Sequence, residues 1–506
     1  MNSDETSPLL NKLNGEKKGD ILTYPPAHKV QGRALILLFD GTGDSEDQDI
    51  SNVVALKRML HPIDDPKKQM IFYQTGIGTY HPDFPGLRDK KIPVISTASR
   101  TVDSAVAWSL GSHVQEAYKW IMDKYEDGDR ICMFGFSRGA YTARAVGGMI
   151  NKIGLLPKSR EDQVERAYES YKQKGKDYKK EWQAFREING SRDVPIEFLG
   201  VWDTVSSVGV VYGKTLPFAD RNGSVKTFRH AVALDEHRAR FRQDMWRLPK
   251  FSEHNKKPWS WSTDADQVWF AGAHCDVGGG SVINGTRPNL AHIALRWMIR
   301  EIFKKEAGIL FDPAELRAIG LDPDALYPVV KTRPPALEPT SDMTLSSSNT
   351  IKQPNAIVRF GSWVKSFFVT PPKEEKPDYS IYGSYSEEQL DLVDALAPIF
   401  DQLALKTAKW ALLEIVPMKI RGYTPNLGKG RVIPPPFDPR APGSTDDMKK
   451  KAEKDPRWTK VRVHRTVKTR MSCKTADGKE RYVPRATVNG EIGLDKLNPD
   501  LIEWVD

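Results

Sequence analysis

Short apolar runs punctuate the chain, and each ends in a tight polar or glycine-rich loop. The clearest runs are residues 34–39, 130–134, 196–201 and 268–271, with a weaker one at 70–74. Apolar stretches of this length without polar alternation are typical of strands buried on both faces. We therefore expect these five segments to form a central sheet.

Segments with helical spacing lie between the apolar runs. In residues 102–125, Val106, Leu110 and Val114 share one face, and residues 138–152 and 290–302 also have helical patterns. The highly charged stretch 161–189 predicts a solvated helical insertion. Alternating buried strands and helices imply a mostly parallel sheet with helices on both faces, which is an α/β fold.

Composition changes along the chain and suggests four parts. Residues 1–30 are polar and we expect a disordered tail, and residues 31–330 hold the α/β domain. Residues 331–357 form a Pro- and Ser-rich linker or long loop, and 358–506 form an irregular extension packed on that domain. A helix is expected around residues 387–413, and Pro398 should kink or split it. The tail contains an acidic dileucine arrangement at Glu5 to Leu10, which is similar to a sorting signal.

The overall composition excludes several classes of protein. The chain has 506 residues, a formal net charge of +9, 39% hydrophobic residues and three scattered cysteines. No apolar run nears the ~20 residues of a membrane span, and we expect no secretory signal, disulfide framework or metal site. The charge is mild and lacks interleaved aromatic residues, so we expect no nucleic-acid partner. These features predict a cytoplasmic globular protein without a cofactor.

The strongest chemical signal is Gly135-Phe136-Ser137-Arg138-Gly139, a G-x-S-x-G placed between a predicted strand and a small-residue helix. A tight turn at such a junction raises the serine hydroxyl above the sheet, and the flanking positions must be small for the helix to pass the strand. The motif therefore identifies Ser137 as a candidate nucleophile.

A serine nucleophile needs a base, and the base needs a third group to orient it. In α/β-hydrolases the acid and then the histidine follow the serine in chain order, at the ends of later strands. Asp203 follows the run 196–201, and His274 follows the run 268–271. Taken singly, Asp203 could be a helix N-cap and His274 a structural histidine. Their joint order and placement favour a Ser137–His274–Asp203 triad.

Backbone amides are expected to hold the oxyanion. The first donor would be the N–H of Arg138, and the second would come from Gly41 or Thr42 in the loop after the first strand. Asp40 in that loop resembles part of the D-x-D-G-T signature of haloacid-dehalogenase-type phosphatases. The nucleophile position of that signature is Leu38 here, so we interpret Asp40 as a residue that shapes the site.

A second glycine-rich loop follows the histidine. Asp276, Gly278 and Gly279 could shape a backbone nest or orient His274, and Asp276 is the alternative triad acid. Arg138 and Arg144, on the predicted helix after Ser137, could pair with carboxylates or meet a phosphate headgroup.

Five motifs together resemble one known family. They are Leu38-Phe39-Asp40-Gly41-Thr42, Gln74-Thr75-Gly76-Ile77-Gly78-Thr79, Phe134 to Arg144, Gly200-Val201-Trp202-Asp203-Thr204-Val205 and Gly272 to Gly280. The set resembles the catalytic domain of type VI secretion phospholipase effectors, formerly a domain of unknown function. The stretches 410–417 and 463–467 are similar to features of fungal members. The resemblance implies an α/β-hydrolase fold and lipolytic ester hydrolysis through Ser137, Asp203 and His274.

We therefore expect a serine hydrolase that cleaves carboxylic esters, with lipid or phospholipid acyl esters as the favoured substrates. The alternatives are a thioesterase or another acyl hydrolase with the same triad, and a non-catalytic interaction scaffold on a hydrolase fold. A lipid substrate implies peripheral contact with a membrane surface. Candidate interfacial aromatic residues are Trp259, Trp261, Trp363, Phe367 and Phe368. The sequence leaves the oligomeric state open.

Overall fold

The computed structural model describes most of the chain from residue 23 onward. The described residues are 23–41, 50–60, 66–76, 96–175, 178–205, 216–238, 241–247, 261–282, 284–341, 343–346, 385–401, 431–434, 436, 446–475, 478, 481–488 and 491–506. The predicted tail signal at Glu5 to Leu10 lies outside them, and so do Trp259, Trp363, Phe367 and Phe368.

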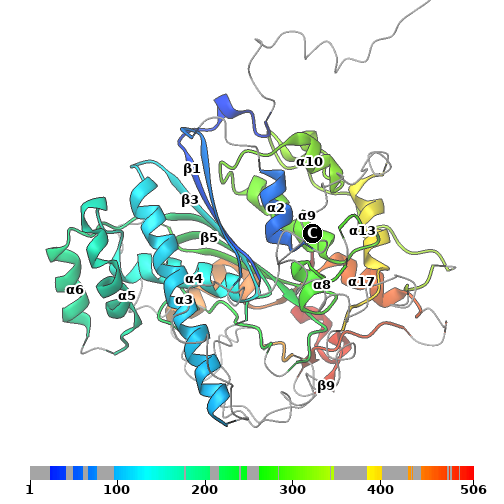
Figure 1. Ribbon diagram of the computed structural model, residues 1–506. Helices are drawn as coiled ribbons and strands as arrows, with labels where there is room; N and C mark the ends of the chain where they lie inside the picture. The colour runs from blue at the N-terminus through cyan, green and yellow to red at the C-terminus, as the bar shows by residue number, and fades with distance from the viewer. Residues whose placement is uncertain are drawn as a thin grey trace, which may run out of the picture.

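A single eight-stranded sheet organises the described part of the chain (Figure 1). Its strands are β1 (Ala34–Phe39), β2 (Gln69–Gln74), β3 (Arg130–Phe136), β4 (Ile196–Trp202), β5 (Val225–Ala233), β6 (Asp264–Phe270), β7 (Val461–His464) and β10 (Ile502–Val505). The spatial order is β10-β7-β6-β5-β4-β3-β1-β2, and every neighbouring pair is parallel. This arrangement confirms the α/β fold.

Each central strand buries both of its faces. In β1, Ile36 and Leu38 join one hydrophobic cluster, whereas Leu37 and Phe39 join a second cluster on the opposite face. All six β1 residues are buried. Because side chains alternate across a strand, an uninterrupted apolar run is what a strand between two helical layers requires.

One face of the sheet is covered by helices from the first half of the chain. They are α3 (Ser96–Lys124), α4 (Ser137–Ile153), α5 (Val164–Lys172) and α6 (Lys179–Ile188). α4 lies against β1, β3 and β4, and α5 packs on α3 and α4. The charged stretch 161–189 thus contains two helices, and each buries aromatic residues toward this layer.

The opposite face carries mainly later helices. They are α2 (Asn52–Met59), α8 (His274–Gly278), α9 (Ala291–Lys304), α10 (Pro313–Ala318), α11 (Pro323–Leu326), α13 (Glu387–Ala395) and α17 (Arg465–Ser472). α13 ends at Ala395, before Pro398, and residues 402–413 of the helix expected here lie outside the described part.

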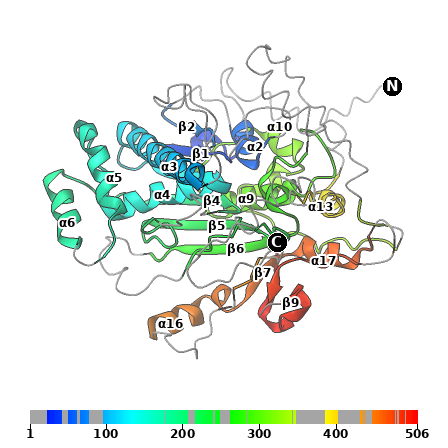
Figure 2. The same cartoon turned by 60° about the horizontal axis from the view of Figure 1, so that its bottom comes forward.

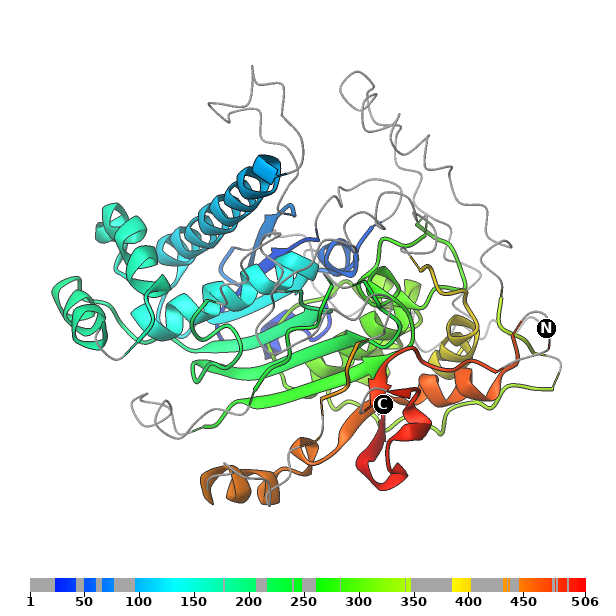
Figure 3. The same cartoon turned by 90° about the horizontal axis from the view of Figure 1, so that it is seen from below.

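Residues near the C-terminus extend the sheet itself. β7 pairs with β6, and β10 pairs with β7, so the sheet edge next to β6 is built from residues beyond 460 (Figure 2). α16 (Asp446–Lys454) and the small hairpin of β8 (Thr487–Val488) and β9 (Glu491–Ile492) lie at the same side (Figure 3). Among the described residues, no helix combines the length and apolar character needed to cross a bilayer.

Candidate active site

Three strands deliver the predicted triad to one edge of the sheet. Ser137 begins α4 directly after β3, Asp203 directly follows β4, and His274 begins α8 four residues after β6 ends. Because these strands are parallel, their carboxyl ends meet at the same edge. β1 lies between β2 and β3, so the chain reverses its direction of strand addition beside Ser137. Crevices at such reversals are the usual ligand sites of open α/β sheets.

Ser137 occupies a strained turn whose neighbours must be small. Its φ is 59°, in the left-handed region that residues other than glycine rarely adopt. A Cβ on Gly139 would lie 2.3 Å from the Phe39 carbonyl oxygen, and a Cβ on Gly135 would lie 2.7 Å from the Ala140 backbone. The two glycines therefore let α4 pass close to the ends of β1 and β3 and hold Ser137 above the sheet.

The three side chains form a hydrogen-bonded row. His274 Nε2 lies 2.8 Å from Ser137 Oγ, and His274 Nδ1 lies 2.5 Å from Asp203 Oδ2. All three residues are buried. The arrangement lets one imidazole nitrogen take a proton from the hydroxyl while the other donates to the carboxylate.

Asp203 is fixed by several partners. Its Oδ1 accepts a hydrogen bond of 2.9 Å from the Ala233 amide, and Arg431 donates to both carboxylate oxygens. Burial alone would raise the pKa of Asp203, but the Arg431 guanidinium and the hydrogen bond with His274 outweigh it and hold that pKa well below its usual range. The carboxylate is therefore ionised at neutral pH.

His274 is enclosed by aromatic and charged neighbours. The Phe136 and Phe241 rings lie 4.6 Å and 5.0 Å from the imidazole, measured between ring centroids. The His274 amide donates to Glu236 Oε2 at 3.3 Å, and Glu236 in turn binds Arg238. Burial lowers the pKa of His274 because it disfavours the imidazolium, and Asp203 offsets part of that effect. The imidazole is thus neutral and can act as a base.

The predicted oxyanion donors have different surroundings. Arg138 is the second residue of α4, where backbone amides have no acceptor within the helix. The Gly41 amide donates to Asp40 Oδ1 at 2.7 Å, so it is engaged in its own loop. Thr42 lies outside the described residues.

Asp40 organises the loop after β1. Besides the Gly41 amide, its carboxylate accepts hydrogen bonds from Ser51 Oγ at 2.5 Å and from Tyr73 Oη at 2.7 Å. These contacts tie the loop to the start of α2 and to β2.

The glycine-rich segment expected as a loop after His274 begins as the short helix α8, and it supports the imidazole by packing. A Cβ on Gly278 would fall 1.9 Å from the Phe136 ring, so the glycine leaves room for the ring that lies beside His274. Gly279 (φ 89°) lies against the backbone of Ser51 and Asn52. Asp276 accepts from the amides of Ala273 (2.9 Å) and Phe400 (3.0 Å), whereas Asp203 occupies His274 Nδ1.

Of the two arginines on α4, Arg144 is a structural residue. Its buried guanidinium donates to the Ala219 carbonyl at 2.6 Å and to backbone oxygens of the segment around Asp244, and it lies 3.7 Å from the Asp244 carboxylate. Arg138 pairs with no carboxylate within the described part of the chain, and burial lowers its pKa to about 10.

Sequence reasoning missed Arg431. It lies in a Pro- and Gly-rich stretch without helical or strand periodicity, and its partner Asp203 is 228 residues away. No local signal in the sequence links the two.

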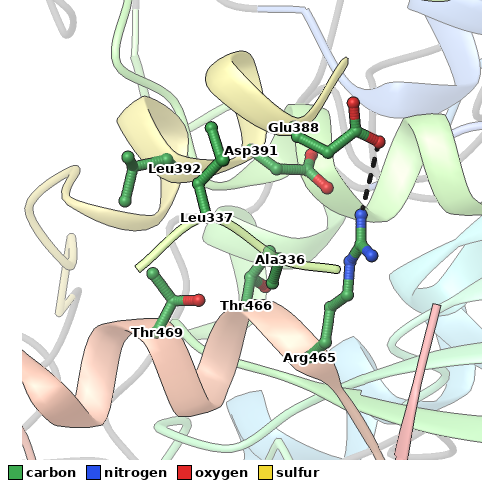
Figure 4. A pocket seen from close by; sticks show the side chains of 8 residues that line it. All are labelled: Ala336, Leu337, Glu388, Asp391, Leu392, Arg465, Thr466 and Thr469. Carbon is green, nitrogen blue, oxygen red and sulfur yellow. Dashed lines mark ion pairs between the residues drawn. The ribbon is translucent and has the colours of Figure 1, made fainter. Parts of the chain in front are cut away.

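A separate concavity lies between residues 336–337, α13 and α17 (Figure 4). Arg465 Nη2 lies 3.5 Å from Glu388 Oε1 across it. Its lining includes none of Ser137, Asp203 or His274, so it is not part of the triad site. In the described ranges, no group of three or more His, Cys, Asp or Glu side chains is arranged to hold a metal ion.

Comparison with known proteins gives a family match and several similar chains. Residues 33–301, more than half of the chain, match the model of the type VI secretion system phospholipase effector Tle1-like catalytic domain. The uncharacterized protein YEL023C of Saccharomyces cerevisiae is 34% identical over 249 residues, which are 46% of this chain and 36% of that protein. The chain thus spans about a third of the length of this curated relative.

Two solved structures are more distant. A crystal structure of an uncharacterized protein from Pseudomonas aeruginosa has 21% identity and a TM-score of 0.32, and covers 58% of this chain and 48% of that one. The structure of the Tle1 effector bound to the VgrG spike of the type 6 secretion system has 19% identity and a TM-score of 0.25, and covers 56% and 57%.

Proposed function

Because the chain belongs to the family of Tle1-like phospholipase effector catalytic domains, we propose that it is a serine hydrolase that cleaves the acyl esters of lipids, with phospholipids as the main substrate class. The observation that carries this proposal is the hydrogen-bonded row of Ser137, His274 and Asp203 at the carboxyl edge of the sheet. Family membership supports lipid esters as the substrate class, and the row of side chains supports the serine-hydrolase mechanism.

In the first half of the reaction, Ser137 Oγ attacks the ester carbonyl as His274 Nε2 takes its proton. The carbonyl oxygen becomes an oxyanion, which the Arg138 amide at the first turn of α4 holds. Collapse of this intermediate breaks the bond to the alcohol. His274 returns the proton to that leaving alcohol, and the acyl group stays on Ser137.

In the second half, water replaces the alcohol. His274 takes a proton from the water, the resulting hydroxide attacks the acyl carbonyl, and the fatty acid leaves as Ser137 recovers its proton. Asp203 keeps Nδ1 protonated and stabilises the imidazolium in both halves, which its low pKa permits.

Arg138 supports a phospholipid rather than a neutral ester as the substrate. It follows the nucleophile directly, is partly exposed, and has no carboxylate partner within the described part of the chain. Its guanidinium is therefore available to a phosphate group near the scissile ester.

The test is hydrolysis of phospholipid vesicles and of a short p-nitrophenyl ester by wild type and Ser137→Ala. We expect the variant to lose at least about 10,000-fold in kcat because its nucleophile is gone. A matched control is Ser224→Ala, which removes a buried, hydrogen-bonded serine at the amino end of β5 and should keep full activity.

Two results would contradict parts of the proposal. Near wild-type hydrolysis by a folded Ser137→Ala protein would remove Ser137 from the mechanism. Cleavage of thioesters or water-soluble esters, with phospholipids left intact, would refute the substrate class.

A further inference from the structure

We infer that Arg431 is a positioning residue that holds the Asp203 carboxylate in the orientation in which it aligns His274, so that residues beyond the family-matched region complete the active site. This inference rests on the proposed function. The matched region ends at residue 301, whereas Arg431 belongs to a segment that reaches the triad from the C-terminal part of the chain.

The guanidinium of Arg431 uses all five of its N–H groups on this site. Nη1 donates to Asp203 Oδ1 and, at 3.3 Å, to the Ala233 carbonyl. Nη2 donates to Asp203 Oδ2 at 2.8 Å and to the Phe241 carbonyl at 2.6 Å, and Nε donates to the same Phe241 oxygen at 3.0 Å. A fork with every donor occupied fixes the plane of the carboxylate it binds.

That plane decides where His274 lies. Arg431 donates to both oxygens of Asp203, the Ala233 amide also donates to Oδ1, and Oδ2 meets His274 Nδ1. Asp203 has no exposed surface, and its φ of 41° is strained. A buried carboxylate in a strained backbone needs a fully satisfied set of partners to stay ionised and aimed.

Arg431 is itself held by the C-terminal part of the chain. The Thr487 amide donates to the Arg431 carbonyl at 2.7 Å, and the Ile433 amide donates to the Thr487 carbonyl at 2.9 Å. Gln243 Nε2 donates to the Val432 carbonyl at 2.7 Å from the other side. Residues 431–433 are thus hydrogen-bonded on one side to β8 and on the other to the segment of residues 241–243, whose Phe241 also contacts His274.

The charges around Asp203 determine what removal of Arg431 does. The groups that face Asp203 or lie in its field are His274, Arg431, Arg238 and His230, and Glu236 acts on His274 and Arg431. With Arg431 present, Asp203 is ionised beside a neutral imidazole. Without it, the unpaired carboxylate is disfavoured by burial, so either Asp203 is protonated or His274 becomes an imidazolium that pairs with it. In both cases the neutral His274 with ionised Asp203 exists only at higher pH.

The experiment compares the pH dependence of kcat/KM for wild type, Arg431→Met and Arg431→Lys, with a p-nitrophenyl ester as substrate. For Arg431→Met we expect kcat to fall about 100-fold or more with little change in KM, and the acid limb of the profile to move up by about one pH unit or more. Lysine keeps the charge but loses the fork, so Arg431→Lys should recover part of kcat and keep the acid limb near its wild-type position.

Arg296→Lys is the matched control, because Arg296 is equally buried and forked onto Asp391 and Asp394, away from the triad. It should leave both kcat and the acid limb unchanged. An unshifted acid limb in Arg431→Met, or an equal shift in Arg296→Lys, would overturn the positioning role. If Arg431→Met fails to fold, Arg431→Lys alone decides. A folded Arg431→Lys protein with wild-type kcat overturns the positioning role, and a folded one with reduced kcat supports it. The activity of Ser137→Ala tests only the proposed serine-hydrolase function. It therefore distinguishes failure of that function from failure of the positioning role of Arg431.

Discussion

Two buried arginine–aspartate clusters in this molecule have the same chemistry and different surroundings. Beside the triad, Arg431 binds Asp203. Between α9 and α13, Arg296 binds Asp391 and Asp394 with contacts of 2.6 and 2.8 Å. In both clusters burial alone would raise the pKa of the aspartate, and arginine outweighs it. The difference lies in the next partner: Asp203 meets His274, whereas Asp391 meets a second arginine, Arg333.

In the proposed mechanism, this difference separates a site that transfers protons from a cluster that joins segments of the chain. The imidazole next to Asp203 can change its charge and reaches a serine hydroxyl. The second cluster contains permanently charged guanidiniums and ties α9 to α13 and to residue 333. A lowered carboxylate pKa is therefore no sign of catalysis by itself. A histidine lies in the field of each aspartate, His274 near Asp203 and His464 near Asp391, and it is the hydrogen bonds of His274 to both Asp203 and the Ser137 hydroxyl that point to proton transfer.

The largest expected effect comes from removing the negative charge on the triad side. Asp203→Asn should lower kcat by about 10,000-fold, because a neutral amide neither fixes the His274 tautomer nor stabilises the imidazolium. Steady-state kinetics on the ester substrate measure it. A kcat within tenfold of wild type would show that the two clusters do not differ in function.

Removing the arginine of the second cluster should lower the stability of the protein and leave catalysis unchanged. Arg296→Met leaves Asp391 and Asp394 buried beside fewer positive charges, and breaking such a pair costs about 3–5 kcal/mol of the free energy of unfolding. Urea denaturation gives this value, and kcat per folded molecule should remain at the wild-type level. A stable Arg296→Met protein with reduced kcat would reverse the assignment.

A third buried aspartate, Asp276, sharpens the comparison because no arginine forms an ion pair with it among the described residues. Burial raises its pKa to about 7 from an ordinary value of 3.8. A raised folded-state pKa gives stability that is present below about pH 4 and is lost as pH rises toward 7. Asp276→Asn should remove that loss, so its stability relative to wild type should increase from pH 5 to pH 8, by on the order of 2 kcal/mol.

Denaturation curves at pH 5, 6.5 and 8 for wild type and Asp276→Asn provide the measurement. A constant difference across the three pH values would mean that Asp276 is ionised in the folded protein throughout, and that it resembles Asp203 and Asp391 in spite of lacking their arginines.

The sequence predicts those strands whose buried positions are occupied by apolar residues. β1, β3, β4 and β6 are recognisable for that reason, and the glycines around Ser137 identify the turn. β5 is missed because it contains Lys226, Arg229 and His230. Arg229 is buried by pairing with Glu301 at 2.6 Å and with Asp264 at 3.0 Å, which are partners that local patterns cannot reveal.

The same reason explains what the sequence reveals of the site. Ser137, Asp203 and His274 each follow a recognisable strand, so the parallel sheet itself predicts their proximity. Arg431 follows no such element, and β7 and β10 are four-residue strands in a basic, Pro-rich region. Contacts between segments that are hundreds of residues apart depend on the completed fold, and they become visible only there.

The claim on which the comparison depends is that Ser137 is a nucleophile activated by His274 and Asp203. The most direct measurement is reaction with a fluorophosphonate, followed by mass-spectrometric mapping of the adduct. We predict a single phosphonyl group on Ser137 in the wild type, formed far more slowly in Asp203→Asn and at the wild-type rate in Arg296→Lys. An unlabelled wild-type protein, or an adduct on a residue other than Ser137, would contradict the account.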